Sequence, residues 1–275
     1  MSVVQATPSA AVRVAAREDV EAAASVLTRA YLNDAALNWF GCVKKQNAAT
    51  DIDSPVPGVQ QTIKNLRCFQ RSLVTITMLV GGVVTLAVVP SQDDGKGEKI
   101  VGVAVWLQPG QTLDMPLDKL LKAGAWSVLK GWGIRGFKRI FLDFTPSVEK
   151  ALSKAFKARS MDRLDSCHLL AIVVDPDWQG KGVSSALMRD CFSRAKPKPI
   201  HLEASSPKSR DIYAHFGFEI NDEHLFGKGR IDHHGLPAKG AEATGFSEWV
   251  MTKVGIMDFE LNHQWVFVSG PDFWL

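Results

Sequence analysis

In Val173-Val174-Asp175-Pro176-Asp177-Trp178-Gln179-Gly180-Lys181-Gly182-Val183-Ser184-Ser185-Ala186-Leu187-Met188, an apolar strand passes through a tight turn directly into a helix. Gly180 and Gly182 have no Cβ, so they let a ligand approach the backbone closely and permit positive φ. The first N–H groups of the helix lie at the positive end of its dipole, where a pyrophosphate binds favourably. The sequence therefore predicts an anion-binding loop between the strand and the helix.

Two common phosphate-binding loops can be compared with this spacing. A Walker loop requires G-x-x-x-x-G-K-[ST], which Gly180-Lys181-Gly182-Val183-Ser184 does not supply. A dinucleotide fingerprint requires a third glycine or alanine where Ser185 stands. Because Glu203 lies near the position of its acidic residue, about twenty residues on, the spacing weakens the dinucleotide interpretation without removing it.

The run from Gln179 to Ser184 resembles motif A of the GNAT superfamily of N-acetyltransferases, [QR]-x-x-G-x-[GA], which binds the pyrophosphate of acetyl-coenzyme A. Ser184 departs from the glycine or alanine that is usual at the sixth position. Downstream, the apolar strand 200–204 is followed by a turn and Tyr213-Ala214-His215-Phe216-Gly217-Phe218. This segment resembles the Y-x-x-x-G-F signature that the superfamily shows after its fifth strand. The two motifs in this order support the resemblance.

Shorter segments are similar to puromycin N-acetyltransferase and its relatives. Residues 12–20 resemble their first strand and helix entry, 103–109 their third strand, and 202–207 their fifth strand and turn. The resemblance covers most of residues 12–253 in patches. It implies an acetyl-CoA-dependent N-acetyltransferase that acts on the amine of a small molecule, in detoxification or secondary metabolism.

The resemblance also implies an α/β fold, in which a mixed, mostly antiparallel twisted sheet is flanked by helices. It places the acetyltransferase domain at 12–254, with a helical insertion over 110–165 that helps to bind the acceptor. We expect residues 1–11 to be a disordered tail. The aromatic residues 255–275 are expected to pack on the domain.

Hydrophobic periodicity predicts the individual elements. The strands expected are 12–15, 83–89, 100–107, 168–174, 200–204 and 248–254. The helices expected are 20–31, 59–72, 115–130 and 147–159, with a glycine-rich break at 131–136. Residues 34–57 are expected to be irregular, and the segment after Phe218, with His224, His233 and His234, to be a loop.

Composition argues against several classes of protein. The chain has 275 residues, of which 46% are hydrophobic and 22% charged, and a formal net charge of +3. These values are ordinary for a globular protein with a sizeable core, and so mild a charge does not favour a nucleic-acid binder. The apolar run 73–89 is short for the roughly 20 residues of a membrane span and contains Gly81-Gly82, so we expect a helix end and a strand rather than a membrane protein.

The remaining sequence features favour a cytoplasmic protein without a metal. Four scattered cysteines form no C-x-x-C pair, and residues 1–11 lack a secretory signal. His233 and His234 have only Asp232 beside them, so solvated histidines are expected rather than metal ligands. A small-molecule amine is the expected partner, and the protein is expected to be a monomer or homodimer.

Two side chains are candidates for proton transfer. The resemblance places Tyr213 where the superfamily has the proton donor to the CoA sulfur, whereas a buried tyrosine with an ordinary hydrogen bond is the alternative. Glu203 is the candidate general base, because a carboxylate within an apolar strand is costly unless it is paired or has a raised pKa, and a raised pKa suits a base for an ammonium. The alternative is that the Glu203 side chain points into solvent. Asp34 and Glu248 are the next candidates.

The donor site follows from the same resemblance. Free backbone groups where the fourth strand separates from the fifth would hold the acetyl group and pantetheine, and the contributors are Ala171, Ile172, Val173 and Val174. The pyrophosphate would bind to Gln179, Gly180, Lys181, Gly182, Val183 and Ser184. Ser206 or Ser209 would replace an asparagine common after the fifth strand. The ammonium groups of Lys181 and Lys208 either neutralise phosphates or are simply solvated.

Two other functions stay open. A protein or peptide N-acetyltransferase would need an open groove, whereas the insertion and the C-terminal extension favour a closed apolar pocket. A non-catalytic acyl-CoA-binding module would keep the loop without needing Tyr213. The aromatic residues of the insertion are expected mainly to pack helices, with one or two lining the acceptor pocket: Trp126, Trp132, Phe137, Phe141 and Phe144.

Overall fold

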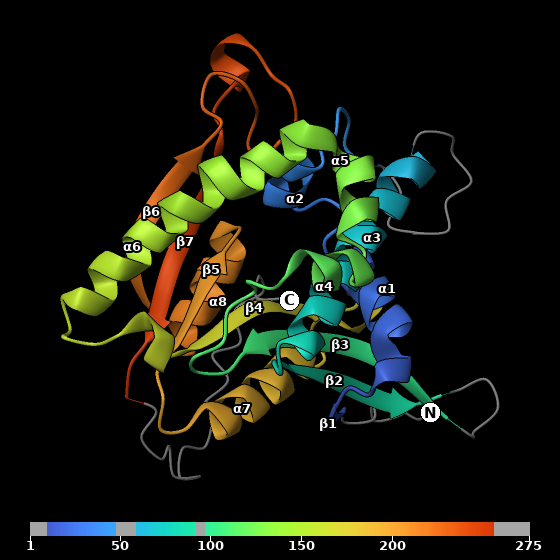
Figure 1. Ribbon diagram of the computed structural model, residues 1–275, viewed down its shortest axis with the longest axis vertical. Coiled ribbons are helices and arrows are strands. Elements are labelled where there is room, and N and C mark those ends of the chain that lie inside the picture. Colours follow the sequence, from blue (N-terminus) through green and yellow to red (C-terminus); the bar gives the residue numbers. More distant parts are fainter. Residues whose placement is uncertain (1–9, 48–58, 92–96, 256–275) are drawn as a thin grey trace, which may run out of the picture.

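A seven-stranded sheet forms the centre of the computed structural model, which describes residues 10–47, 59–91 and 97–255 (Figure 1). In sheet order the strands are β1 (Ala11–Val14), β2 (Val83–Pro90), β3 (Glu98–Leu107), β4 (Cys167–Val174), β5 (Ile200–Ala204), β7 (Phe246–Lys253) and β6 (Glu219–Phe226). Neighbouring strands are antiparallel, except that β4 and β5 run parallel. The predicted mixed, mostly antiparallel sheet is confirmed.

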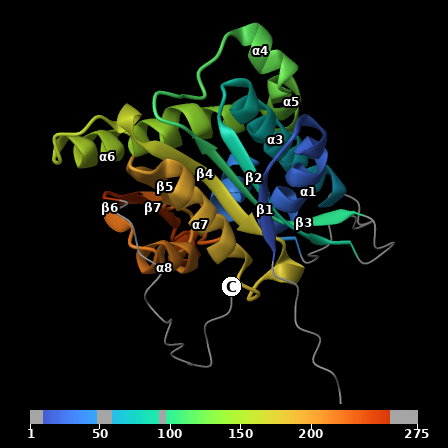
Figure 2. The same cartoon turned by 90° about the horizontal axis from the view of Figure 1, so that it is seen from below.

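Helices cover both faces of this sheet (Figure 2). One face carries α1 (Val20–Ala30) and α3 (Val59–Leu79), and the other carries α7 (Val183–Ala195) and α8 (Pro207–His215). Successive side chains of a strand point to opposite faces, so each central strand supplies two cores. On β3, Val103 and Val105 pack under α1 and α3, whereas Ala104 and Trp106 pack on the α7 side.

The segment predicted to be irregular contains a short helix, α2 (Ala35–Phe40), so that part of the prediction is wrong. Asp34 begins the helix by accepting a hydrogen bond from the Leu37 N–H at 3.0 Å, which is the usual role of an N-terminal capping residue. Trp39 then packs against Phe226 of β6 and Phe246 of β7, and Phe40 packs against Phe144, all far along the chain. Tertiary packing thus stabilises a helix too short to be recognised from periodicity.

The insertion between β3 and β4 is helical, as expected, and a kink at Gly133 interrupts it within the glycine-rich segment where a break was predicted. Its elements are α4 (Leu117–Lys122), α5 (Ala125–Lys138), a π-helical segment (Arg139–Phe144) and α6 (Thr145–Lys157). Only Gly133 departs from helical geometry, at φ 66°. A Cβ on Gly136 would lie 2.6 Å from the Phe40 carbonyl oxygen, and one on Gly131 would lie 2.7 Å from Oδ1 of Asn65. These glycines therefore serve close helix packing.

Two further boundaries differ from the prediction. The helix predicted over 59–72 continues to Leu79, with Val74 and Thr77 on its buried side, so that it ends just before Gly81, where the apolar run was expected to contain a helix end. The segment around His224, expected to be a loop, is the edge strand β6, which pairs with β7 along its length. Its side chains are mostly polar, so the sequence of this strand shows no alternation of apolar residues. Short 3-10 turns lie at Arg17–Asp19, Arg163–Asp165, Pro176–Trp178 and Gly240–Glu242.

The expected tails fall largely outside the described residues. This holds for residues 1–9 and 256–275. Ala11, placed at the end of the N-terminal tail by the sequence, belongs to β1 and pairs with Val88.

Candidate active site

The parallel strands β4 and β5 separate after a short contact. Their pairing joins only Cys167–Leu169 to Ile200–Leu202. On its other side, β4 pairs Leu169 with Trp106 and Ala171 with Val105, so Leu170 is an extra residue that forms a β-bulge. A bulge bends its strand and increases the local twist. The edge of β4 beyond Leu169 is therefore left open on the side of β5.

Backbone groups at this open edge can be assigned from the sheet pattern. The Asp175 N–H donates to the Val101 carbonyl of β3 at 2.9 Å. Because hydrogen-bonding direction alternates along an antiparallel strand, the backbone groups of Ile172 and Val174 point away from β3. Those of Ala171 and Val173 belong to the ladder with β3, and their side chains are buried. Ile172 and Val174 are thus the predicted contributors that the fold presents to the opening.

The predicted anion-binding loop lies where β4 leads into α7. Gly180 and Gly182 have φ of 74° and 75°, the left-handed region that favours glycine. Gly182 caps α7, and none of the described side chains caps that end of the helix. No described atom outside its neighbouring residues lies within 4 Å of where a Cβ on Gly182 would stand. The first N–H groups of α7 therefore face an open approach, which fits a pyrophosphate.

Ion pairs attach this loop to the other face of the sheet. Arg29, near the end of α1, lies with Nε 3.0 Å from the Asp175 carboxylate and with a terminal nitrogen 2.8 Å from that of Asp177. Lys181 donates to the Asp177 carbonyl at 3.0 Å and lies 4.5 Å from the centre of the Trp178 ring. Lys181 is thus folded back along the loop, where its charge still adds to the positive potential.

The other predicted donor residues have mixed positions. Gln179 is exposed, whereas the Val183 side chain is buried against β3, so Val183 offers only its backbone. Ser209 and Ser206 hydrogen-bond each other in the capping box that begins α8. This local role occupies the Ser209 hydroxyl, so its contact with the donor stays a prediction.

Tyr213 lies on α8, its ring 5.8 Å from that of Phe218. Burial of the hydroxyl raises its pKa, and the nearby Cys191, Glu203 and Glu248 raise it further. The hydroxyl therefore keeps its proton at physiological pH. A general acid must hold its proton until the leaving group needs it, so this environment is compatible with the predicted role.

Glu203 lies on the face of β5 opposite the buried Leu202 and Ala204, yet it does not point into solvent. Its side chain is only 13% exposed. Oε2 lies 2.9 Å from Nε2 of His168 on β4. Oε1 is buried and has no hydrogen-bond partner among the described residues. One carboxylate oxygen is thus held, and the other is left able to accept a proton.

The two alternative bases belong to the same region. Asp34 accepts a hydrogen bond from the Ser205 hydroxyl at 2.6 Å, and burial raises the pKa of the Asp34 carboxyl. Glu248 on β7 is 2% exposed. Burial raises its pKa well above the ordinary value, and repulsion from Asp34 and Glu203 adds to this. A cation bound among the carboxylates of Asp34, Glu203 and Glu248 would reduce both the free-energy cost of burying their charges and the repulsion between them.

Tyr31, at the end of α1, is a site residue that the sequence did not single out. Burial raises its pKa, as do Tyr213, Asp34 and Glu248, while a hydrogen bond from the backbone of Ile172 partly offsets this. Its hydroxyl therefore lies at the opening beside β4. The one available signal was scarcity, since the chain has only two tyrosines and both are in this region.

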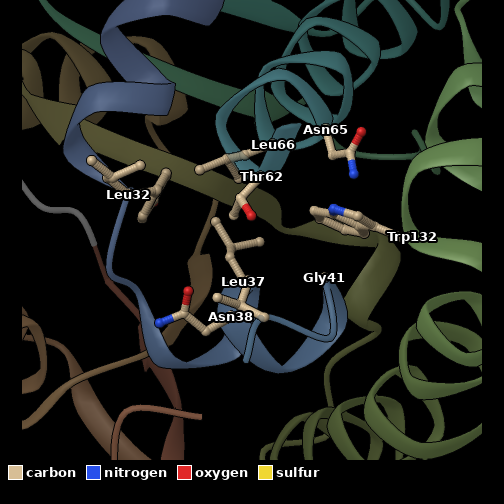
Figure 3. Close-up of a pocket in the computed structure, with 10 residues that line it drawn as sticks. Leu32, Leu37, Asn38, Gly41, Thr62, Asn65, Leu66 and Trp132 are labelled. Carbon is tan, nitrogen blue, oxygen red and sulfur yellow. The ribbon is translucent and has the colours of Figure 1, made fainter. Parts of the chain in front are cut away.

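A cavity adjoins Tyr31 between α2, α3 and α5 (Figure 3). Leu32, Leu37, Leu66 and Trp132 supply its apolar lining, and Asn38, Thr62 and Asn65 its polar part. The Trp132 ring stacks on Phe69 at 4.5 Å, which fixes its orientation. Of the insertion's aromatic residues, Trp132 lines this cavity and Phe144 packs in the core. Trp126, Phe137 and Phe141 are about half exposed.

The described residues contain neither a metal-binding cluster nor a membrane-spanning helix. No group of three or more His, Cys, Asp or Glu side chains there could hold a metal ion. None of the described helices is both long and apolar enough to cross a membrane.

Comparisons with known proteins agree with this geometry. Residues 157–234 match the family model for the acetyltransferase (GNAT) domain. An uncharacterized N-acetyltransferase of Schizosaccharomyces pombe is 31% identical over 119 residues, which are 42% of this chain and 47% of the relative. The match thus spans about half the length of that curated relative.

Solved structures share the fold. One, from Corynebacterium glutamicum and described as histone acetyltransferase HPA2 and related acetyltransferase, is 22% identical with a TM-score of 0.51, covering 92% of this chain and 99% of that one. Arylalkylamine N-acetyltransferase 2 from Aedes aegypti is 18% identical with a TM-score of 0.52, covering 89% and 98%. Putative arylalkylamine N-acetyltransferase 7 from the same mosquito is 15% identical with a TM-score of 0.54, covering 90% and 87%.

The family match defines the class: residues 157–234 match an acetyltransferase domain, of a family that uses acetyl-CoA. More particularly, this domain is a GNAT domain, as the two sequence motifs predicted. The narrower resemblance to puromycin N-acetyltransferase stays a prediction.

Proposed function

We propose that the protein transfers the acetyl group of acetyl-CoA to the amine of a small molecule. One observation carries this proposal. The Glu203 Oε1 atom is buried without a hydrogen-bond partner among the described residues, close to the open edge of β4. An unpartnered buried acceptor is costly in free energy, so its persistence favours a role in binding or proton transfer.

The donor site fits acetyl-CoA. The pyrophosphate would bind to the Gln179–Ser184 loop at the start of α7, and the backbone groups of Ile172 and Val174 would hold the pantetheine and the acetyl carbonyl. Acetyl-CoA supplies the activated acetyl group as a thioester. The left-handed glycines and the open space at Gly182 support this assignment.

The chemistry requires proton transfers at the nitrogen and at the sulfur. Glu203 Oε1 accepts a proton from the acceptor's ammonium, which frees the nitrogen lone pair to form the new C–N bond at the thioester carbonyl. Tyr213 donates its hydroxyl proton to the sulfur as the C–S bond breaks, and the second proton that the acylated nitrogen loses restores the Tyr213 hydroxyl. A backbone N–H at the β4 edge stabilises the charge that develops on the carbonyl oxygen. The free thiol and the N-acetylated amine are the products.

The acceptor is proposed to approach from the side of α2, α3 and α5. The carboxylates of Asp34, Glu203 and Glu248 favour a cation there, and the cavity beside Tyr31 and Trp132 offers an apolar wall. Two similar structures are described as arylalkylamine N-acetyltransferases, one of them putative, which supports amines of this general kind.

The test is thiol release from acetyl-CoA with phenethylamine, tryptamine, putrescine, puromycin, a histone-like peptide or no acceptor. We expect release with at least one small amine and an acetylated product by mass spectrometry. Glu203→Gln should lose most of this activity at pH 7 and regain part of it at high pH, where the free amine is abundant. Acetylation of the peptide alone would support a peptide acetyltransferase, and binding without release a non-catalytic module.

A further inference from the structure

We propose that His168 is a positioning residue for the reaction: its Nε2–H holds Oε2 of Glu203, so that Oε1 alone faces the acceptor's ammonium. The inference rests on the proposed function, because it assumes that Glu203 is the base. It assigns a role to a side chain that neither sequence motif contains.

The place of the pair in the sheet explains the contact. His168 on β4 is directly opposite His201 on β5, and Glu203 is the next residue of β5 on the same face. Pairing between the strands ends at Leu202. The His168 side chain therefore reaches across the point where the strands begin to separate. The atoms Nε2 and Oε2 are 2.9 Å apart, and the side chains are 19% and 13% exposed.

The direction of this hydrogen bond follows from its chemistry. An ionised carboxylate can only accept hydrogen bonds, so Nε2 of His168 must carry the proton. Glu203 is then bound through Oε2, while Oε1 stays buried and without a partner among the described residues. An imidazole N–H orients the carboxylate without the permanent positive charge that a lysine or arginine would place beside it. The carboxylate thus stays available as a proton acceptor.

A second histidine fixes the His168 ring. The rings of His168 and His201 are stacked with centres 4.2 Å apart, and Phe156 of α6 contacts His201 edge-on. The Ser166 hydroxyl donates to the Arg163 carbonyl at 2.5 Å, so it must accept from Nδ1–H of His201 at 2.8 Å. Burial lowers the pKa of His201 well below its ordinary value, with smaller contributions from His168 and Arg163. His201 is therefore neutral and packs His168 without competing for Glu203.

The contact with His168 is suited to orienting the Glu203 carboxylate. A Glu side chain has several rotatable bonds, and loss of one fixed contact would let Oε1 sample positions away from the amine. Misplacement of a reacting group by about 1 Å can reduce a rate by about a hundredfold. The groups that face His168 are Glu203 and His201 of β5, with Arg163 and Phe156 beyond His201.

The test uses two substitutions that separate the N–H donor from the ring. His168→Gln keeps an amide N–H near the position of Nε2, and His168→Phe keeps a ring for stacking but removes the donor. With the best small amine of the panel, we expect His168→Phe to lower kcat by about tenfold or more, with the KM for acetyl-CoA unchanged. His168→Gln should retain most activity. The exposed His233→Phe is the matched control.

A double-mutant cycle gives the decisive readout. If His168 acts through Glu203, the variant that combines His168→Phe with Glu203→Gln should be no slower than Glu203→Gln alone. The pH profile of His168→Phe should also shift toward that of Glu203→Gln. Multiplying losses in the double variant, a wild-type profile in His168→Phe, or equal losses in Phe and Gln variants with lowered Tm would each overturn the proposal. A fully active Glu203→Gln would instead overturn the base assignment.

Discussion

Tyr213 and Tyr31 illustrate how single side chains are tuned in this site. Each hydroxyl is buried near Asp34 and Glu248, and this environment raises both pKa values. Both hydroxyls therefore stay protonated, and each can donate a hydrogen bond. Tyr213 comes from α8, whereas Tyr31 comes from α1 on the opposite face of the sheet. The separation of β4 and β5 is what brings them together.

Removal of the Tyr213 hydroxyl tests the proposed general acid. Tyr213→Phe should lower kcat by about tenfold or more, because the departing thiolate would lose its proton donor. The KM for acetyl-CoA should change little, since the ring and its packing remain. Steady-state kinetics with thiol detection measures both values. Wild-type turnover in this variant would remove Tyr213 from the mechanism.

Glu248 gives a prediction about stability. Its pKa is raised in the folded state above the ordinary 4.5, so the folded state binds the proton more tightly than the unfolded chain does. Its contribution to stability is therefore present at low pH and lost as pH rises from about 4.5 to the folded-state pKa. Glu248→Gln removes this loss, so its Tm should exceed that of the wild type by a few degrees at pH 8 but not at pH 4.

Thermal unfolding from pH 4 to 8 measures this difference. The exposed Glu223→Gln on β6 is the control, and its Tm should follow the wild type at every pH. A Tm gain for Glu248→Gln that is the same at all pH values would contradict the argument. So would a gain that shrinks as pH rises.

At the scale of elements, the turn between β4 and α7 has the geometry that its sequence predicts. Gly182 lies at φ 75° at the first turn of α7, facing open space. The proposed anion-binding role thus depends on the end of one helix and on two residues without a Cβ.

Gly182→Ala should raise the KM for acetyl-CoA by about tenfold, because the left-handed conformation costs an L-residue roughly 1–2 kcal/mol and the methyl group enters the predicted pyrophosphate position. kcat at saturation should be nearly unchanged. Gly229→Ala is a matched control, since Gly229 has φ of 80° and no described atom outside its neighbouring residues within 4 Å of the added Cβ. Equal effects of both variants on KM would mean that strain alone is being measured.

Elements were predictable where local pattern and tertiary packing agree. The strand, loop and helix around Gly182 follow from apolar runs and glycines, and the Ile200–Ala204 strand was located to the residue. The short α2 was missed because its stability comes from Asp34 and from aromatic contacts with distant strands. The break predicted at residues 131–136 is present as a kink at Gly133, but sequence alone does not show that Asn65 and Phe40 closely approach Gly131 and Gly136.

The candidate site divides in the same way. Motif residues such as Tyr213 could be proposed as candidates from sequence, because the motif fixes their spacing along the chain. Tyr31, His168 and Ser205 could not, because their roles arise from contacts between elements. Such contacts depend on the β4 bulge and on strand register, and neither can be recognised from a single sequence.

At the scale of the whole molecule, the donor loop and the proposed acceptor side lie on different parts of one sheet. The loop begins α7 on one face, and α2, α3 and α5 surround the cavity on the other (Figures 1 and 2). The opening between β4 and β5 is the place where the two sides meet. Under the proposed function, acetyl-CoA and the acceptor amine would therefore approach this opening from opposite sides of the sheet.

Hydrogen exchange should separate these two sides. Added acetyl-CoA is expected to slow amide exchange at the end of β4 and at the start of α7, where it would order free N–H groups. Exchange in α4, which has no buried residue, should stay fast. Mass spectrometry of peptides from both regions, with and without acetyl-CoA, measures this. Protection confined to the insertion would place the donor elsewhere.

The scarcity of tyrosine has a practical consequence. The chain holds two tyrosines, and both lie at the opening of the sheet. Protein grown with fluorotyrosine would therefore give a ¹⁹F spectrum of two resonances, one from Tyr31 and one from Tyr213. Assignment needs only one Tyr→Phe variant. A change in either resonance would then report the binding of an added ligand, because no other residue carries the fluorine label.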